Sequence, residues 1–179
     1  MTIDTPRLLL REFVESDWRA VHTYASIPEV VQFETWGPNS ETETQFFVNS
    51  AIGFQNEKPR RTFEFAIILK SDQSLIGGCG IRIKNDTNRD GDLGFTIHSN
   101  YWGKGLGTEV ANSLISFGFD NLKLHRIWVT CNVKNLASAR VLEKSGMKLE
   151  GTLRKNLWQR TDWRDSFLYA ILDEDQNLM

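Results

Sequence analysis

The chain has 179 residues, which is within the usual range for one domain and long enough to bury a single hydrophobic core. Apolar residues make up 40% and charged residues 25%, a globular composition that excludes a disordered or fibrous chain. With 21 basic and 23 acidic residues the formal charge is −2, so no basic surplus favours nucleic acid as a partner. We expect one domain over residues 1–179.

Two further features bear on location and redox state. The chain contains no run of about 18 apolar residues, and residues 1–6 lack the pattern of a secretory signal. We therefore expect a cytoplasmic protein that does not use a membrane. Cys79 and Cys131 lie in separate apolar stretches without Cys-x-x-Cys spacing, which predicts buried thiols and no metal site.

The first third of the chain is predicted to form one strand and two helices. Residues 7–13 are mostly apolar and suit a strand, and Ser16-Asp17 offers an N-cap for a helix to about residue 27. Residues 35–40 contain glycine and proline and predict a loop. Acidic residues in a first turn and phenylalanines at helical spacing then predict a helix over residues 41–55.

The middle of the chain is predicted to be an antiparallel meander. Residues 62–69, 75–84 and 92–98 have the apolar, extended pattern of strands. The polar segments 71–74 and 85–91 have the composition of turns. Three consecutive strands are therefore expected here.

The last third is predicted to alternate helices and strands. Helical patterns cover residues 108–119 and 135–144, and strand patterns cover 126–131, 147–154 and 167–172. The whole order predicts an α/β (α+β) domain with one mixed sheet and helices packed on it.

Three glycines, Gly103, Gly105 and Gly107, lie between a predicted strand and a predicted helix. Glycine lets the backbone approach a ligand closely, so the amides of residues 104–108 can turn inward as donors. The positive end of the helix dipole and the charge of Lys104 would add to a pyrophosphate site. A simple tight turn has the same composition and remains the alternative.

Two other nucleotide motifs fit these glycines less well. A dinucleotide-binding motif needs Gly-x-Gly-x-x-Gly after the first strand of a parallel unit, whereas Gly-x-Gly-x-Gly here follows an antiparallel meander. A P-loop ends in Gly-Lys-Ser/Thr, and Leu106-Gly107-Thr108 lacks that lysine.

The segment Trp102-Gly103-Lys104-Gly105-Leu106-Gly107 resembles the coenzyme A loop of the GCN5-related N-acetyltransferase (GNAT) superfamily, Arg/Gln-x-x-Gly-x-Gly/Ala. Trp102 departs from the usual Arg or Gln. The form Tyr-Trp-Gly-Lys-Gly is common in the branch that contains the ribosomal-protein alanine and serine N-acetyltransferases, the RimJ/RimL-like branch, and this likeness accounts for the departure.

Further motifs of that branch follow in the same order. They are Arg-Leu-x-Leu-Arg at residues 7–11, Asn-x-x-Ser at 135–138, Glu-Lys-x-Gly at 143–146, and the ending at 150–154 and 165–172. The resemblance thus covers nearly the whole chain, from residue 5 to residue 172.

The resemblance implies a single-domain GNAT fold, with a mostly antiparallel sheet of about seven strands and about four helices, splayed between strands 4 and 5. It implies acetyl-CoA as the co-substrate, direct acetyl transfer without a covalent intermediate, and no metal. The implied coenzyme-binding residues are Phe95, Thr96 and Ile97 through their main chain, Trp102, Gly103, Lys104, Gly105, Leu106, Gly107 and Thr108 around the pyrophosphate, and Asn135 at the arm.

Acetyl transfer to an amine needs a base for the ammonium proton and a donor for the leaving thiolate. Many family members use a tyrosine as that donor, but its position here is Leu142. The resemblance implies that Ser138 donates instead, although Ser138 could also only stabilise its helix. Asp92 and Glu64 each interrupt an apolar strand and are the candidate bases, and the alternative is that both simply face water.

We predict an enzyme, an N-acetyltransferase acting on a primary amine. The acceptor is a protein N-terminal α-amino group or a small amine such as an antibiotic, polyamine or metabolite, and the family fold places Glu34, Trp36 and residues 156–164 near its entrance. A non-catalytic coenzyme A module and a nucleotide-binding protein are the other classes. A homodimer is compatible with the sequence.

Overall fold

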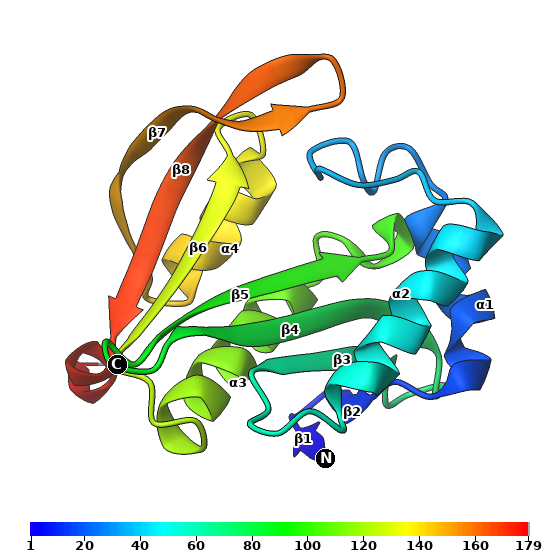
Figure 1. The fold of residues 1–179 in the computed structure, drawn as a ribbon, viewed down its shortest axis with the longest axis horizontal. Helices are drawn as coiled ribbons and strands as arrows, with labels where there is room; N and C mark the ends of the chain where they lie inside the picture. The colour runs from blue at the N-terminus through cyan, green and yellow to red at the C-terminus, as the bar shows by residue number, and fades with distance from the viewer. Residues whose placement is uncertain (179) are drawn as a thin grey trace.

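The computed structural model describes residues 1–178, with side chains to residue 175. The strands are β1 (Thr2–Asp4), β2 (Leu8–Glu12), β3 (Thr62–Leu69), β4 (Leu75–Asn85), β5 (Asp90–Ile97), β6 (Arg126–Asn132), β7 (Lys148–Gln159) and β8 (Asp162–Leu172). The helices are α1 (Trp18–Ala25), α2 (Glu41–Phe54), α3 (Leu106–Asp120) and α4 (Leu136–Lys144), with 3-10 turns at Glu15–Asp17, Ser99–Tyr101 and Asp173–Leu178. One sheet joins the strands in the order β1-β2-β3-β4-β5-β6-β8-β7 (Figure 1).

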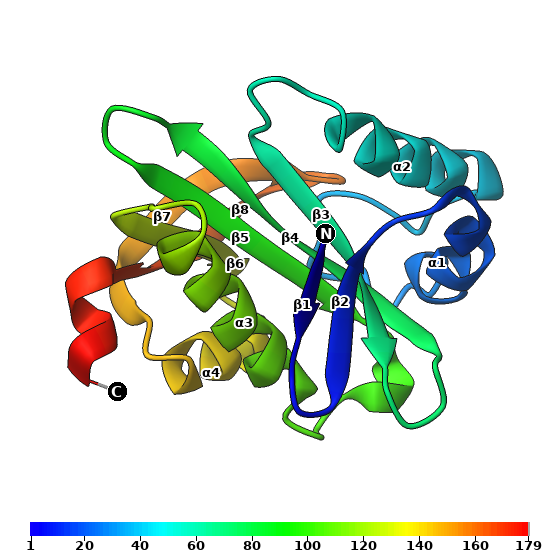
Figure 2. The same ribbon diagram turned by 90° about the horizontal axis from the view of Figure 1, so that it is seen from below.

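The helices cover both faces of the sheet (Figure 2). Helices α3 and α4 lie on one face and α1 and α2 on the other, and a separate apolar core fills each interface. Helix α3 approaches the sheet closely at Gly118, where a Cβ atom would lie 2.6 Å from Ile127 and 2.7 Å from Ile81. None of the helices described is both long enough and apolar enough to span a membrane.

The sheet opens between β5 and β6. These parallel strands pair only from Asp90 to Asp92 and from Arg126 to Trp128. Beyond that point β5 continues beside β4 as far as Ile97, while β6 continues beside β8 as far as Asn132. The two strands therefore diverge like the arms of a V (Figure 1), and in the part of the chain that the structure describes no other strand fills the gap.

The predicted fold class is confirmed, with two differences in detail. Residues 2–4 form an additional edge strand, so the splay lies between the fifth and sixth strands of the chain. The last two strands, at residues 148–159 and 162–172, are longer than predicted. Their joining hairpin extends beyond the core and carries polar residues, so the apolar alternation that marks a half-buried strand is missing there.

Candidate functional site

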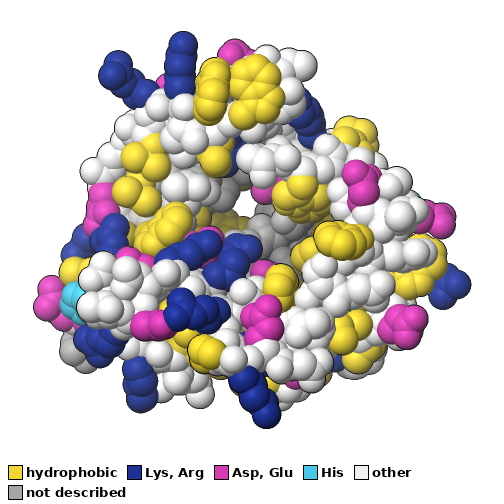
Figure 3. All heavy atoms as spheres, in the orientation of Figure 1, with side chains coloured by type: hydrophobic (Ala, Val, Ile, Leu, Met, Phe, Trp, Pro, Cys, Tyr) yellow, Lys and Arg dark blue, Asp and Glu magenta, His cyan; other side chains and the backbone are white. Residues whose placement is uncertain are grey.

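A cavity of about 730 Å³ occupies the gap between β5 and β6. One half is lined by β5, β6 and the start of α4, and the other by α1, α2, β4 and the α1–α2 loop, which comprises residues 26–40. The space-filling view shows a hollow in the middle of the molecule with basic side chains gathered beside it (Figure 3). The two walls of the cavity thus come from different parts of the chain.

The glycine loop lies at the N-terminus of α3. Gly103 has φ +73° and Gly105, the N-cap residue, has φ +75°, a left-handed conformation that L side chains rarely adopt. The following residues, Leu106 to Thr108, begin a helix of 15 residues whose first amides have no partner within the helix. This geometry is suited to binding an anion.

Two side chains of the loop are turned back onto the strand exit. The Trp102 indole donates to the carbonyl of Ile97 at 2.7 Å. The Lys104 ammonium donates to the carbonyl of Asn100 at 3.0 Å and lies 5.1 Å from the centroid of the Tyr101 ring. Lys104 therefore helps to fix the loop.

The start of α4 brings Asn135 and Ser138 to the cavity wall opposite Phe95 and Thr96. Asn135 Oδ1 accepts from the Ser138 main-chain N–H at 3.1 Å and so caps the helix. The cap uses the Asn135 side chain and leaves the Ser138 hydroxyl out of it. Of the residues with implied coenzyme contacts, Phe95, Thr96 and Asn135 line the cavity.

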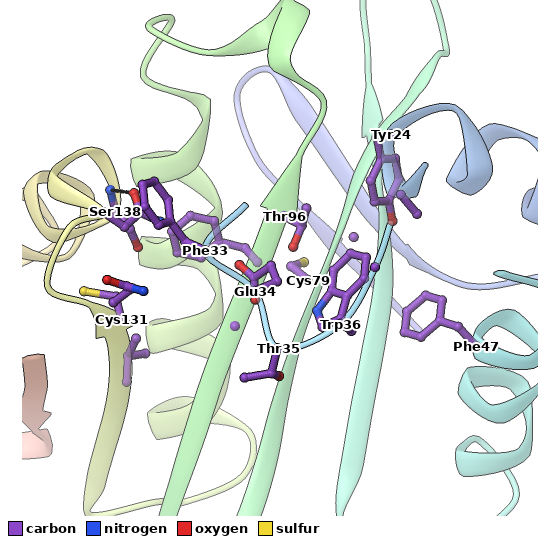
Figure 4. Close-up of a pocket in the computed structure, with 18 of the residues that line it drawn as sticks. Tyr24, Phe33, Glu34, Thr35, Trp36, Phe47, Cys79, Thr96, Cys131 and Ser138 are labelled. Carbon is purple, nitrogen blue, oxygen red and sulfur yellow. Dashed lines mark hydrogen bonds between the residues drawn. The ribbon is translucent and has the colours of Figure 1, made fainter. Parts of the chain in front are cut away.

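The thiol of Cys131 lies near Ser138 on the same wall (Figure 4). Burial raises the pKa of Cys131 to about 11, partly offset by Arg164 and by the Ser138 hydroxyl. This thiol is protonated at neutral pH and is not an activated nucleophile. The predicted free, buried cysteines are confirmed for both Cys79 and Cys131.

Glu64 reaches the cavity from the neighbouring strand β3. Its side chain is only 13% exposed, and Arg82 Nη1 lies 3.5 Å from Glu64 Oε1. Burial, with Asp92 acting in the same direction and Arg82 against it, raises the pKa of Glu64 to about 7. A carboxyl with such a pKa can accept a proton at neutral pH.

Glycines on β4 and β5 make the space for these groups. Glu64, Gly80 and Gly94 are cross-strand neighbours. A Cβ at Gly80 would lie 2.4 Å from Glu64 Oε2, and a Cβ at Gly94 would lie 3.2 Å from Arg82. The missing side chains of Gly80 and Gly94 therefore leave room on this face of the sheet for the Glu64 carboxyl and the Arg82 guanidinium.

The other candidate base, Asp92, is placed differently. Asp92 Oδ1 lies 3.3 Å from Arg82 Nε and 3.2 Å from Lys84 Nζ, so two cations share this carboxylate. It does not belong to the cavity lining, whereas Glu64 does. Of the two candidate bases, only Glu64 therefore faces the cavity, while Asp92 holds Arg82.

The second half of the cavity is both acidic and aromatic. Burial raises the pKa of Glu34, and Arg164 acts against this. The rings of Tyr24, Trp36 and Phe47 surround the same space (Figure 4). Tyr24 is 3% exposed, and burial raises the pKa of its hydroxyl well above the usual value, so the group stays protonated.

The β7–β8 hairpin holds the α1–α2 loop over this half. Gln159 Nε2 donates to the carbonyls of Gln32 and Glu34, both at 2.9 Å, while Gln159 Oε1 accepts from Asn132 at 3.0 Å. Arg160 donates to the Val31 carbonyl at 3.1 Å. The loop that carries Glu34 and Trp36 is therefore fixed by its neighbour hairpin.

Several of these residues were not singled out from the sequence. Arg82 and Tyr24 belong to patterns that also occur in ordinary strands and helices, whereas Gln159 lies in the stretch 156–164 that was expected near the acceptor entrance. The alternation Gly80-x-Arg82 opposite Glu64 was the one available signal, because residues two apart on a strand share a face. Among residues 1–178 no three His, Cys, Asp or Glu side chains are grouped to hold a metal.

The Acetyltransferase (GNAT) domain family matches residues 7–148. An uncharacterized N-acetyltransferase of Bacillus subtilis, YnaD, is 36% identical over 177 residues, covering 99% of this chain and 100% of the relative. A GNAT-family acetyltransferase from Bacillus anthracis has a crystal structure that superposes with a TM-score of 0.86 at 34% identity, covering 97% of this chain and 99% of the other. The chain belongs to the GNAT family of N-acetyltransferases.

Two solved structures share the fold at lower identity and contain coenzyme A. RimL, a ribosomal L7/L12 alpha-N-protein acetyltransferase, superposes with a TM-score of 0.85 at 20% identity, covering 96% of this chain and 98% of the other. Spermidine N-acetyltransferase from Vibrio cholerae, bound to CoA and spermine, gives 0.81 at 22% identity, covering 96% and 98%. Proteins with this fold thus include acetyltransferases of proteins and of small amines.

Proposed function

We propose that this enzyme transfers the acetyl group of acetyl-CoA to a primary amine, with the N-terminal α-amino group of a protein as the first candidate acceptor. The cavity in the β5–β6 gap carries this proposal, because Glu64 and Ser138 both line it. Its lining residue Phe95 reaches the glycine loop, since the Phe95 ring lies 3.6 Å from a Cβ atom built at Gly107. The pyrophosphate would lie on residues 102–108, and the pantetheine arm would lie along Phe95 to Ile97 and Asn135.

The transfer itself needs few groups. Glu64, directly or through water, takes a proton from the acceptor ammonium, and the neutral nitrogen attacks the thioester carbonyl. The nitrogen adds to the carbonyl carbon to give a tetrahedral oxyanion, and the C–S bond then breaks. The Ser138 hydroxyl gives its proton, directly or through water, to the departing thiolate and regains one from the second proton of the new amide nitrogen, so coenzyme A leaves as the free thiol. Backbone amides at the gap would stabilise the oxyanion.

A small cationic amine is the second candidate acceptor, and one observation favours it. Glu34, Glu43 and Glu64 all line the cavity, together with the rings of Trp36 and Phe47. Carboxylates and aromatic faces together attract organic cations. An acceptor with several amino groups, such as a polyamine, would use more of these contacts than a single protein terminus.

The first test measures coenzyme binding by thermal unfolding. At acetyl-CoA concentrations a hundred times the dissociation constant, we expect the free energy of unfolding to rise by about 2.7 kcal/mol. ATP and NAD at the same concentrations should give no shift. A shift with ATP or NAD alone would instead support a nucleotide-binding protein.

A second test measures thiol release with acetyl-CoA and a panel of peptides and polyamines, and the compound that causes release identifies the acceptor. Coenzyme binding without thiol release would indicate a non-catalytic coenzyme A module.

Substitution of Ser138 by alanine tests the proposed thiolate donor. We expect kcat to fall roughly tenfold or more, since general acid catalysis typically contributes about 10² or more. Coenzyme affinity should stay unchanged, because the helix cap uses the Asn135 side chain and the Ser138 main chain. Steady-state kinetics measure kcat, and calorimetric titration of acetyl-CoA measures the coenzyme affinity separately. Unchanged turnover would reduce Ser138 to a structural residue.

A further inference from the structure

Arg7, the first arginine of the 7–11 motif, contacts the glycine loop and α3 together. Its Nε donates to Glu109 Oε2 at 2.7 Å, and its main-chain N–H donates to Glu109 Oε1 at 2.8 Å. Its Nη1 donates to the main-chain carbonyl of Lys104 at 2.8 Å. One residue just before β2 therefore connects the glycine loop with the first turn of the following helix.

Glu109 is a fixed anchor for this contact. Its side chain is 12% exposed, and Thr5 Oγ1 donates to Glu109 Oε1 at 2.6 Å. Burial alone would raise the pKa of Glu109, but the hydrogen bonds from Thr5 and Arg7 outweigh it and lower the pKa. The carboxylate is therefore charged at neutral pH and holds the Arg7 guanidinium in one orientation.

The bond to Lys104 fixes one peptide plane of the loop. In a trans peptide the carbonyl and the following N–H point to opposite sides. Since Arg7 binds the Lys104 carbonyl on the β2 side, the N–H of Gly105 points away from Arg7. On both sides of Lys104 the glycines have positive φ, +73° and +75°, and glycine leaves such a segment many other conformations.

We propose that Arg7 is a positioning residue that sets the glycine loop in its coenzyme-binding conformation before the coenzyme arrives. This inference rests on the proposed function, in which the loop holds the pyrophosphate. A loop already ordered loses less conformational freedom on binding. Removing the contact to Lys104 therefore weakens coenzyme binding without touching the acetyl transfer step.

The second arginine of the motif has a different task and provides a matched control. Arg11 makes a two-point contact with Asp17, from Nη1 to Oδ2 at 2.6 Å and from Nη2 to Oδ1 at 2.7 Å. Asp17 lies at the entry to α1, on the opposite face of the sheet from α3. Both arginines thus make ion pairs from the same strand region, but Arg7 alone contacts the loop.

The experiment titrates acetyl-CoA calorimetrically into the wild type, Arg7→Gln, Arg7→Lys and Arg11→Lys, with thermal unfolding of each protein without ligand. We expect Arg7→Gln to raise the dissociation constant about tenfold or more and Arg7→Lys to restore little of the loss. A lysine keeps the charge but cannot hold Glu109 and Lys104 together. Arg11→Lys should lower Tm and leave the dissociation constant within twofold of wild type.

The outcomes separate this inference from the proposed function. A wild type that does not bind acetyl-CoA contradicts the proposed function itself. A wild type that binds, with Arg7→Gln or Arg7→Lys within twofold of it, overturns the role of Arg7. If Arg7→Gln fails to fold, Arg7→Lys alone decides between a charge and a positioning role. With an active acceptor, kcat at saturating acetyl-CoA should be equal in wild type and Arg7→Lys, while KM for acetyl-CoA rises.

Discussion

Substituting Glu64 by glutamine should reduce kcat/KM by about 10² to 10⁴, the usual contribution of general base catalysis. Because the pKa of Glu64 is about 7, wild-type kcat/KM should rise with pH through about pH 7. Glutamine cannot accept the proton, so the variant should lack this limb. Steady-state rates of thiol release between pH 5.5 and 9 measure both effects.

The matched control is Glu150→Gln, which removes a carboxylate that pairs with Arg126 outside the cavity lining. Its pH profile should follow the wild type. If kcat/KM of Glu64→Gln still rises with pH near pH 7, another group is the base and Glu64 has only a structural role.

The same carboxyl predicts a change in stability that needs no acceptor. Its pKa is raised from 4.5 to about 7 on folding, so the folded state binds more protons than the unfolded state between these values. The contribution of the protonated Glu64 carboxyl to the free energy of unfolding is complete below pH 4.5 and is lost as the pH rises through 7. In total it amounts to about 3 kcal/mol. Glutamine carries no charge to bury, so above pH 7 Glu64→Gln should unfold at higher denaturant concentration than the wild type. A variant less stable at pH 8 would contradict the raised pKa.

The sequence predicted the elements well where the signal is local. The strands near residues 62–69 and 126–131 are mostly apolar, and the predicted start of the helix near Asn135 lies within one residue of the start of α4. The glycine spacing at 103–107 is also local, because left-handed backbone at two of these positions requires glycine.

Contacts between distant segments could not be read in this way. The bond from Arg7 to Lys104 joins residues 97 positions apart, and the bond from Gln159 to Glu34 joins residues 125 apart. Glu64 lines the cavity and Asp92 does not, and this difference follows from the strand register rather than from composition. The motif resemblance predicted the candidate residues, and the structure shows which of them line one cavity.

The hairpin that fixes the α1–α2 loop leads to the second large effect, on acceptor binding. In Gln159→Glu the side chain keeps its size and can still accept from Asn132, but it loses the donors to the Gln32 and Glu34 carbonyls. Two lost hydrogen bonds at about 1 kcal/mol each, with added repulsion between carboxylate and carbonyls, should raise the acceptor KM by about 10- to 100-fold. Coenzyme affinity should not change, since the glycine loop lies elsewhere.

Gln73→Glu makes the same chemical change in the β3–β4 turn, where Gln73 Nε2 donates to the Lys70 carbonyl at 2.9 Å, and should leave the acceptor KM as it is. Hydrogen exchange provides a readout without an acceptor, because amides of residues 31–36 should exchange faster in Gln159→Glu than in Gln73→Glu. Equal exchange in the two variants would show that Gln159 does not hold the loop. Faster exchange with an unchanged acceptor KM would show that the loop is held but that the acceptor binds without it. Only the combination of both changes makes the hairpin part of acceptor recognition.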